Sequence, residues 1–127
     1  MEMSIFVIQW DSGQSAEFAT LEEMDRCIND LENQFDCEPI IAIVGGPNET
    51  SVYFGVGGAL SFISACDPPY KTTVGNPDAE GDRDYYHQGH HSSIANRNLV
   101  PREFARKALH EFCLTGQFAN WQAWEEV

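Results

Sequence analysis

The spacing of hydrophobic and polar positions in the first third of the chain predicts a strand followed by a helix. An apolar run over residues 5–10 has the composition of a β-strand, and the turn-forming residues 11–13 end it. Thr20 and Glu23 then have the spacing of a capping box, which opens a helix by satisfying its free backbone amides. Apolar residues follow at intervals of three and four, as on one buried helix face: Leu21, Met24, Ile28, Leu31 and Phe35. We expect this helix to pack by that stripe and to be strongly acidic on its other faces.

Three β-rich runs come next. Residues 39–44 are almost wholly apolar, and glycine, proline and asparagine follow them. Residues 51–56 and 60–65 are two further runs of strand-forming residues, separated by Gly57-Gly58. Glycine adopts the backbone conformations that tight hairpin turns require, so these two runs predict a β-hairpin.

The region after the hairpin is less regular. Residues 66–82 are rich in proline, glycine and acidic residues, which predicts a long exposed loop of a kind that is often functional. We expect residues 84–87 to form a further strand and residues 89–98 to form another irregular connection.

A second helix is predicted after Pro101, which suits a first helical position, and Gly116 is a typical stop. Its predicted buried stripe consists of Phe104, Ala105, Ala108, Leu109 and Phe112. Residues 121–127 alternate well enough for a closing strand, in which Trp121 and Trp124 cannot face the same side, so we expect one of them in the core.

The order of these elements is β-α-β-β-β-β-α-β within one domain that spans residues 1–127. Hairpin-connected strands beside two amphipathic helices predict the α+β class. We expect a mainly antiparallel sheet of about five to six strands with two helices packed against it.

Charge limits the classes of partner. The chain carries twenty acidic and seven basic residues, a net charge of −13, and residues 1–50 hold eleven acids against one base, Arg26. Such a surface repels nucleic acids and anionic membranes and attracts basic proteins at long range. We therefore expect a protein partner and no direct binding to nucleic acid or membrane, although acidity can also serve solubility alone.

The first residues and the cysteines indicate the cellular compartment of the protein. Residues 1–4 lack the basic start of a secretory signal, so we expect a cytoplasmic protein. Cys27, Cys37, Cys66 and Cys113 are widely spaced, and we expect reduced, mostly buried thiols rather than two disulfides.

No stretch of the sequence supplies a complete catalytic set. His87, His90 and His91 could contribute to a zinc site with Asp82, Asp84 or Cys66, but their spacing matches no established signature. Residues 76–87 imitate a calcium loop, yet its last position is His87 where a glutamate is required. A hydrolase would combine Ser92 or Cys113 with His90 and an acid, but the sequence contains no nucleophile-elbow motif. We expect no catalytic residue, no bound metal and no cofactor.

The second half of the chain resembles a known family. The segments that carry the resemblance are Asp84-Tyr85-Tyr86-His87-Gln88-Gly89-His90-His91-Ser92-Ser93-Ile94, Leu99-Val100-Pro101, Ala105-Arg106-Lys107-Ala108, Glu111-Phe112, Thr115-Gly116 and Trp124-Glu125-Glu126-Val127. They look like the Imm-type immunity proteins of bacterial polymorphic toxin systems, a family associated with deaminase toxins. The resemblance implies a cytosolic protein, without enzymatic activity, that binds a cognate toxin domain and blocks its active site.

The implied partner agrees with the charge. A nucleic-acid deaminase holds a polyanion and draws a base into a tight pocket, so an acidic surface with aromatic side chains can cover its cleft. We expect the contact surface to consist of Asp78, Glu80, Asp82, Asp84, Tyr85, Tyr86, His87, His90 and His91. Only one of the two tyrosines should contact the toxin, because consecutive strand residues face opposite ways. The rival surface is the first helix around Glu22, Asp25 and Asp30, and the rival functions are another acidic adaptor or inhibitor and a metal-dependent enzyme.

Overall fold

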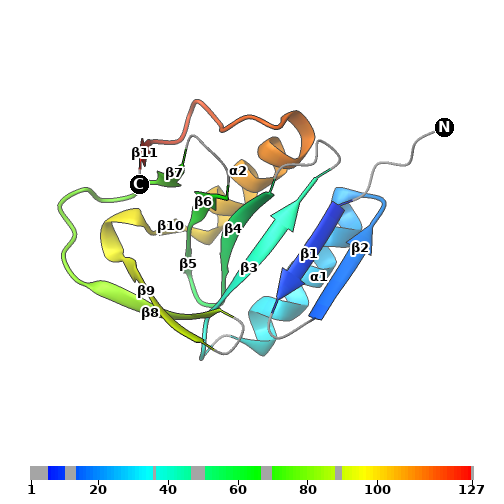
Figure 1. The fold of residues 1–127 in the computed structure, drawn as a ribbon, viewed down its shortest axis with the longest axis horizontal. Helices are drawn as coiled ribbons and strands as arrows, with labels where there is room; N and C mark the ends of the chain where they lie inside the picture. Colours follow the sequence, from blue (N-terminus) through cyan, green and yellow to red (C-terminus); the bar gives the residue numbers. More distant parts are fainter. Residues whose placement is uncertain are drawn as a thin grey trace.

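The computed structural model describes residues 6–10, 14–35, 37–46, 51–66, 70–87 and 90–126. It is an α+β fold, as predicted, with two α-helices and a mainly antiparallel sheet (Figure 1). The helices are α1 (Leu21–Gln34) and α2 (Arg102–Thr115). The central path of the sheet runs in the order β11 (Trp124–Glu126), β7 (Lys71–Thr73), β6 (Ile63–Ala65), β4 (Ser51–Val56), β3 (Ile40–Gly45), β1 (Phe6–Trp10) and β2 (Gln14–Phe18).

A hairpin branches from this path. Strand β8 (Asp82–His87) runs parallel to the start of β3, where Ile40 lies opposite Tyr86, and β9 (His90–Ala95) pairs antiparallel with β8. With this hairpin the sheet has nine strands, so the predicted five to six strands were too few. A 3-10 turn, η1 (Asn96–Asn98), leads to a separate two-stranded pairing of β10 (Val100–Pro101) with β5 (Leu60–Ser61).

Both helices form where the sequence pattern places them. The Thr20 hydroxyl accepts a hydrogen bond from the Glu23 amide at 3.2 Å, which confirms the predicted cap of α1. Helix α2 ends at Gly116, whose φ of 75° lies in the left-handed region that glycine tolerates. Pro101 precedes α2 as its N-cap residue rather than occupying its first turn.

The buried stripe of α2 is shifted from the predicted one. Its buried residues are Ala105, Ala108, Leu109, Phe112 and Cys113. Phe104 is 51% exposed, so its predicted place in the core was wrong. One residue corresponds to about 100° of rotation, which carries Phe104 from the buried face of Ala105 to the side of the helix.

The sheet has two differently covered faces. In Figure 1 both helices lie behind the sheet, and the core there includes Met24 and Ile28 of α1, Leu109 of α2, and Val44 and Phe54 of the sheet. The opposite face carries a smaller cluster of Ile41, Phe62, Tyr85 and Leu99, where the β8–β9 hairpin crosses the strands. The hairpin therefore forms a partial second layer on the face that the helices leave uncovered.

Three strands of the nine-stranded sheet lie where none was predicted. The polar segment β2 pairs along its whole length with β1, β7 interrupts the predicted loop of residues 66–82, and β9 replaces the predicted irregular connection. Their sequences, such as Gln-Ser-Ala-Glu-Phe for β2, contain little of the alternating pattern that signals a strand. A neighbouring strand supplies the hydrogen bonds that stabilise each of them.

The prediction for the two tryptophans is confirmed, whereas the prediction for the cysteines is only partly confirmed. Trp124 packs against the main core while Trp121 is 44% exposed, which confirms that the two face different environments. The four cysteines are reduced, as predicted, but only Cys113 is buried. Cys27 and Cys66 are half-buried and Cys37 is exposed, so the prediction of mostly buried thiols was wrong. Among the described residues, no helix has the length and apolar character needed to cross a membrane.

Candidate functional site

The β8–β9 hairpin carries most of the predicted contact residues and sorts them onto two faces. Side chains alternate along a strand, and directly opposed residues of an antiparallel pair point the same way. The outer face of the hairpin, away from the main sheet, therefore carries Asp82 opposite Ala95, Asp84 opposite Ser93, and Tyr86 opposite His91. The inner face carries Arg83 opposite Ile94, Tyr85 opposite Ser92, and His87 opposite His90.

Tyr85 belongs to the core. Its side chain is fully buried, its ring meets Phe62 edge-on at 5.2 Å between centroids, and its hydroxyl donates to the Leu60 carbonyl at 3.5 Å. Burial raises the pKa of the phenol from its ordinary 10.0 to about 12, with a small opposing effect of Arg83. Tyr85 therefore offers a partner no surface, as expected for one of the two tyrosines, and its place in the predicted contact set is withdrawn.

The outer face brings together the exposed members of the set. Tyr86 is 37% exposed and its ring lies edge-on to His91 at 5.9 Å. His91 Nε2 is 2.7 Å from Asp84 Oδ1, in a pair that is largely exposed and contributes little to stability. Asp82 is exposed beside them. This surface combines carboxylates, one aromatic ring and one imidazole.

Asp78 and Glu80 lie in the turn that leads into β8, and both are exposed. The Asp78 amide donates to Asn76 Oδ1 at 3.0 Å, and Asn96 Nδ2 donates to the Glu80 carbonyl at 2.9 Å. The first bond lies within the turn, and the second joins the turn to Asn96, which directly follows β9. The acidic turn and the outer face of the hairpin are thus neighbouring parts of one structure.

The three histidines do not converge. His87 Nδ1 lies 3.3 Å from the Ile41 carbonyl, with its ring edge-on to Tyr53, whereas His91 is on the opposite face of the hairpin. His90 is opposite His87 and exposed. Within the described ranges, no three His, Cys, Asp or Glu side chains are grouped closely enough to hold a metal ion.

Cys113, an alternative nucleophile, is fully buried. Burial, together with the nearby Asp25 carboxylate as a smaller cause, raises the pKa of its thiol from 9.0 to about 12. A buried thiol with a raised pKa is unreactive, because the thiolate is the nucleophile.

A cavity of about 350 Å³ lies between the hairpin and the sheet, and no sequence pattern predicted it. We call it the hairpin cavity; its lining is Ile41, Tyr53, Phe62, Ser64, Thr72, His87, Ser92, Ser93, Ile94, Ala95 and Asn98. These residues come from six strands, one loop position and the 3-10 turn, so no short sequence motif contains them. The lining contains no carboxylate and no Lys or Arg.

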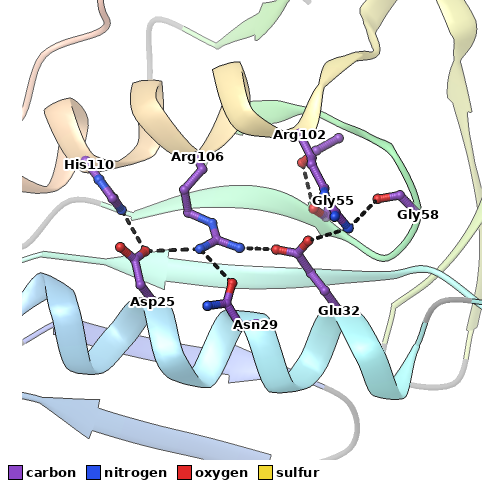
Figure 2. Close-up of polar contacts among 9 residues, drawn as sticks. Asp25, Asn29, Glu32, Gly55, Gly58, Arg102, Arg106 and His110 are labelled. Atoms are coloured by element: carbon purple, nitrogen blue, oxygen red, sulfur yellow. Dashed lines mark hydrogen bonds and ion pairs between the residues drawn. The ribbon is translucent and has the colours of Figure 1, made fainter.

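The rival surface on α1 is partly occupied by the chain itself. Figure 2 shows Asp25, Asn29 and Glu32 of α1 facing Arg102, Arg106 and His110 of α2. Arg106 pairs with Glu32 and lies 3.3 Å from Asp25, and His110 Nε2 lies 2.7 Å from the same carboxylate. Asp25 is therefore committed to helix–helix contacts, while Glu22 and Asp30 are exposed.

Comparison with known proteins supplies the family. No curated protein matches the chain. The family model described as immunity protein Imm1 matches residues 12–125, which include the hairpin, both helices and the acidic turn. This match covers nearly the whole sequence, and the chain therefore belongs to the Imm1 family of immunity proteins.

Proposed function

We propose that this protein binds a cognate toxin domain in the cytoplasm and blocks its active-site cleft with the outer face of the β8–β9 hairpin and the adjoining acidic turn. Membership of an immunity protein family supports the antitoxin role. The observation that carries the choice of surface is the gathering of Asp82, Asp84 and Tyr86 on one exposed face, next to Asp78 and Glu80.

The toxin we propose acts on nucleic acid, and the resemblance to deaminase-associated immunity proteins favours a cytosine or cytidine deaminase. Such an enzyme needs a basic cleft for the phosphate backbone and a pocket for a flipped base. An acidic surface imitates the backbone charge, and the Tyr86 ring can occupy space that a base would fill. Charge complementarity also speeds capture and disfavours wrong partners.

Inhibition by occlusion requires no chemistry from the inhibitor. The protein is proposed to act as a stoichiometric binder without turnover, metal or cofactor, and without direct affinity for nucleic acid. Its net charge of −13 supports the last point, since a polyanion is repelled.

A matched pair of charge reversals tests the surface. We expect Asp82→Lys/Asp84→Lys to abolish protection of cells that produce the toxin encoded beside this gene, because like charge would meet the basic cleft. The control Glu23→Lys/Asp30→Lys makes the same change in net charge on the exposed side of α1 and should protect as wild type does. Asp25 is excluded from the control because it pairs with α2.

Both double variants must first be shown by urea unfolding to be fully folded. Exposed positions usually change stability by under about 0.5 kcal/mol, and the reversal of Glu23 in the first turn of α1 should cost up to about 1 kcal/mol more because a lysine there opposes the helix dipole. If the hairpin variant protects fully and the α1 variant does not, the interface is on α1. If wild type itself neither binds nor neutralises the toxin domain, the proposed function is wrong.

A further inference from the structure

We infer that the free edge of β9 is a docking site for an extended strand of the toxin, which adds to the hairpin and inserts alternate side chains into the hairpin cavity. This inference rests on the proposed function and specifies how the toxin is held. The partner segment that fits has alternating apolar and basic residues.

The lining of the hairpin cavity shows that it borders the backbone of β9. Ser92, Ser93, Ile94 and Ala95 all line it, although they are consecutive. Side chains of consecutive strand residues point to opposite faces, so one face alone cannot supply all four. The cavity is therefore open to the edge of the strand.

Two hydrogen bonds identify which backbone groups point toward that edge. The Asn96 amide donates to the Gly81 carbonyl at 2.9 Å, so Asn96 faces β8. The Tyr86 amide donates to the Pro39 carbonyl at 2.9 Å, so the backbone N–H and C=O groups of Tyr86 and of its opposite residue His91 point away from each other. In an antiparallel ladder, pairs whose backbone groups bond each other alternate with pairs whose groups point outward. Both bonds therefore predict that His91, Ser93 and Ala95 turn their N–H and C=O groups away from β8.

These edge groups have no hydrogen-bond partner in the described part of the chain, where β9 pairs with β8 alone. An exposed row of this kind is a template for another strand. Added in register, a partner strand would form main-chain bonds with His91, Ser93 and Ala95.

The two faces of the added strand would meet different environments. Its inner side chains would enter the hairpin cavity over Tyr53, Ser64 and Thr72, where a lining without carboxylates, Lys or Arg favours apolar or small residues. Its outer side chains would lie beside Ser93, about 10 Å from β8, because adjacent strands are about 4.8 Å apart. Asp82 and Asp84 project on that outer face, within reach of a lysine or arginine.

The charge also argues against a second copy of this chain as the occupant. Each copy carries −13, and edge-to-edge pairing would bring the carboxylates of two hairpins together. A basic strand of a nucleic-acid-directed toxin has the complementary charge.

Ala95→Pro tests the docking edge with little risk to the fold. Ala95 has φ −58°, which proline requires, and its amide faces away from β8. The variant removes an edge donor and places a ring at the docking edge, so we expect the Kd for the purified, catalytically inactive toxin domain encoded beside this gene to rise by about tenfold or more. Ala95→Val, which keeps the amide and adds similar bulk, should bind within about threefold of wild type by the same affinity scale.

Amide hydrogen exchange gives a second measurement on the wild-type protein. Complex formation should slow exchange at His91, Ser93 and Ala95, and Ser93→Pro should weaken binding as Ala95→Pro does. If wild type binds the toxin domain but both proline variants bind equally well and these amides stay unprotected, the docking edge is wrong while the proposed function stands. If wild type does not bind at all, both are overturned, and if wild type forms a dimer that Ala95→Pro disrupts, the edge serves self-association instead.

Discussion

At the scale of single residues, Tyr85 and Tyr86 are neighbours in β8 with opposite environments. Tyr85 is fully buried against Phe62, and Tyr86 is 37% exposed on the outer face of the hairpin. The alternation of strand side chains separates a core residue from a candidate contact residue.

The two tyrosines should therefore respond differently to truncation. We expect Tyr85→Ala to lower the free energy of unfolding by about 3–5 kcal/mol, as for other buried aromatics. Tyr86→Ala should change it by under about 0.5 kcal/mol and yet weaken toxin binding by at least about 2 kcal/mol. Urea unfolding and calorimetric titration measure the two quantities. A strong loss of stability in Tyr86→Ala would place that ring in the core instead.

Alkaline pH should destabilise the protein through two buried groups. Burial raises the pKa of Cys113 from 9.0 and that of Tyr85 from 10.0, each to about 12. A raised folded-state pKa favours the protonated form, so this stability is fully present below about pH 9 and is lost as pH rises toward 12. Urea midpoints measured between pH 8 and 12 should fall, and the fall should be smaller in Tyr85→Phe. A pH-independent midpoint would contradict the buried assignments.

The histidines of the hairpin should bind no metal tightly, because His87 and His91 lie on opposite faces of the hairpin. Elemental analysis of the purified protein should find far less than one zinc per chain, and EDTA should leave its melting temperature unchanged. Stoichiometric zinc that disappears in His90→Ala would favour the enzyme hypothesis.

At the scale of elements, the contact between α1 and α2 depends on charge as well as on the apolar core. The Arg106 side chain contacts Asp25, Asn29 and Glu32 (Figure 2). The side chain of Arg106 is 18% exposed and that of Glu32 only 10%. Arg102 adds a second pairing to Glu32 at 3.1 Å. One helix thus supplies the carboxylates and the other the cations, which aligns them.

Removing the central cation should weaken the pairing of two partly buried carboxylates, because among the described residues Asp25 would keep only His110 and Glu32 only Arg102. We expect Arg106→Ala to cost on the order of 3 kcal/mol in the free energy of unfolding. The matched control is Arg26→Ala, which breaks a largely exposed pair with Glu22 and should cost under about 0.5 kcal/mol. Equal effects in urea unfolding would show that the helix–helix cluster contributes no more than a surface pair.

At the scale of the whole molecule, a net charge of −13 acts on partners before contact. Seven basic residues are present, and Arg26, Arg97, Arg102 and Arg106 already pair with carboxylates of the chain. The field around the protein is consequently negative, which attracts a basic toxin domain.

Association with that toxin domain should be fast and salt-dependent. Electrostatic steering can raise on-rates to about 10⁸ M⁻¹s⁻¹ at low salt, and screening at about 0.1 M limits its range to about 10 Å. Stopped-flow on-rates should fall steeply as salt increases, while off-rates change little. On-rates that stay constant across that range would mean that the acidity serves solubility alone.

The sequence by itself determined the features that depend on local spacing. Thr20 and the intervals from Met24 to Leu31 fix the start and buried face of α1, and Gly116 fixes the end of α2. The Gly57-Gly58 turn and the opposite facing of Tyr85 and Tyr86 also follow from neighbouring residues. Each of these features depends on the backbone geometry of a few consecutive residues, so the local sequence is enough to predict it.

Only the tertiary structure decided what depends on distant residues. Strands β2, β7 and β9 carry weak local patterns and exist because neighbouring strands satisfy their backbone groups. Asp25 belongs to the fold rather than to a free acidic face because Arg106, 81 residues away in sequence, lies beside it. The free edge of β9 and the hairpin cavity also depend on distant residues, because the β8–β9 hairpin lies against strands that come much earlier in the sequence. No periodicity in the sequence predicts that contact.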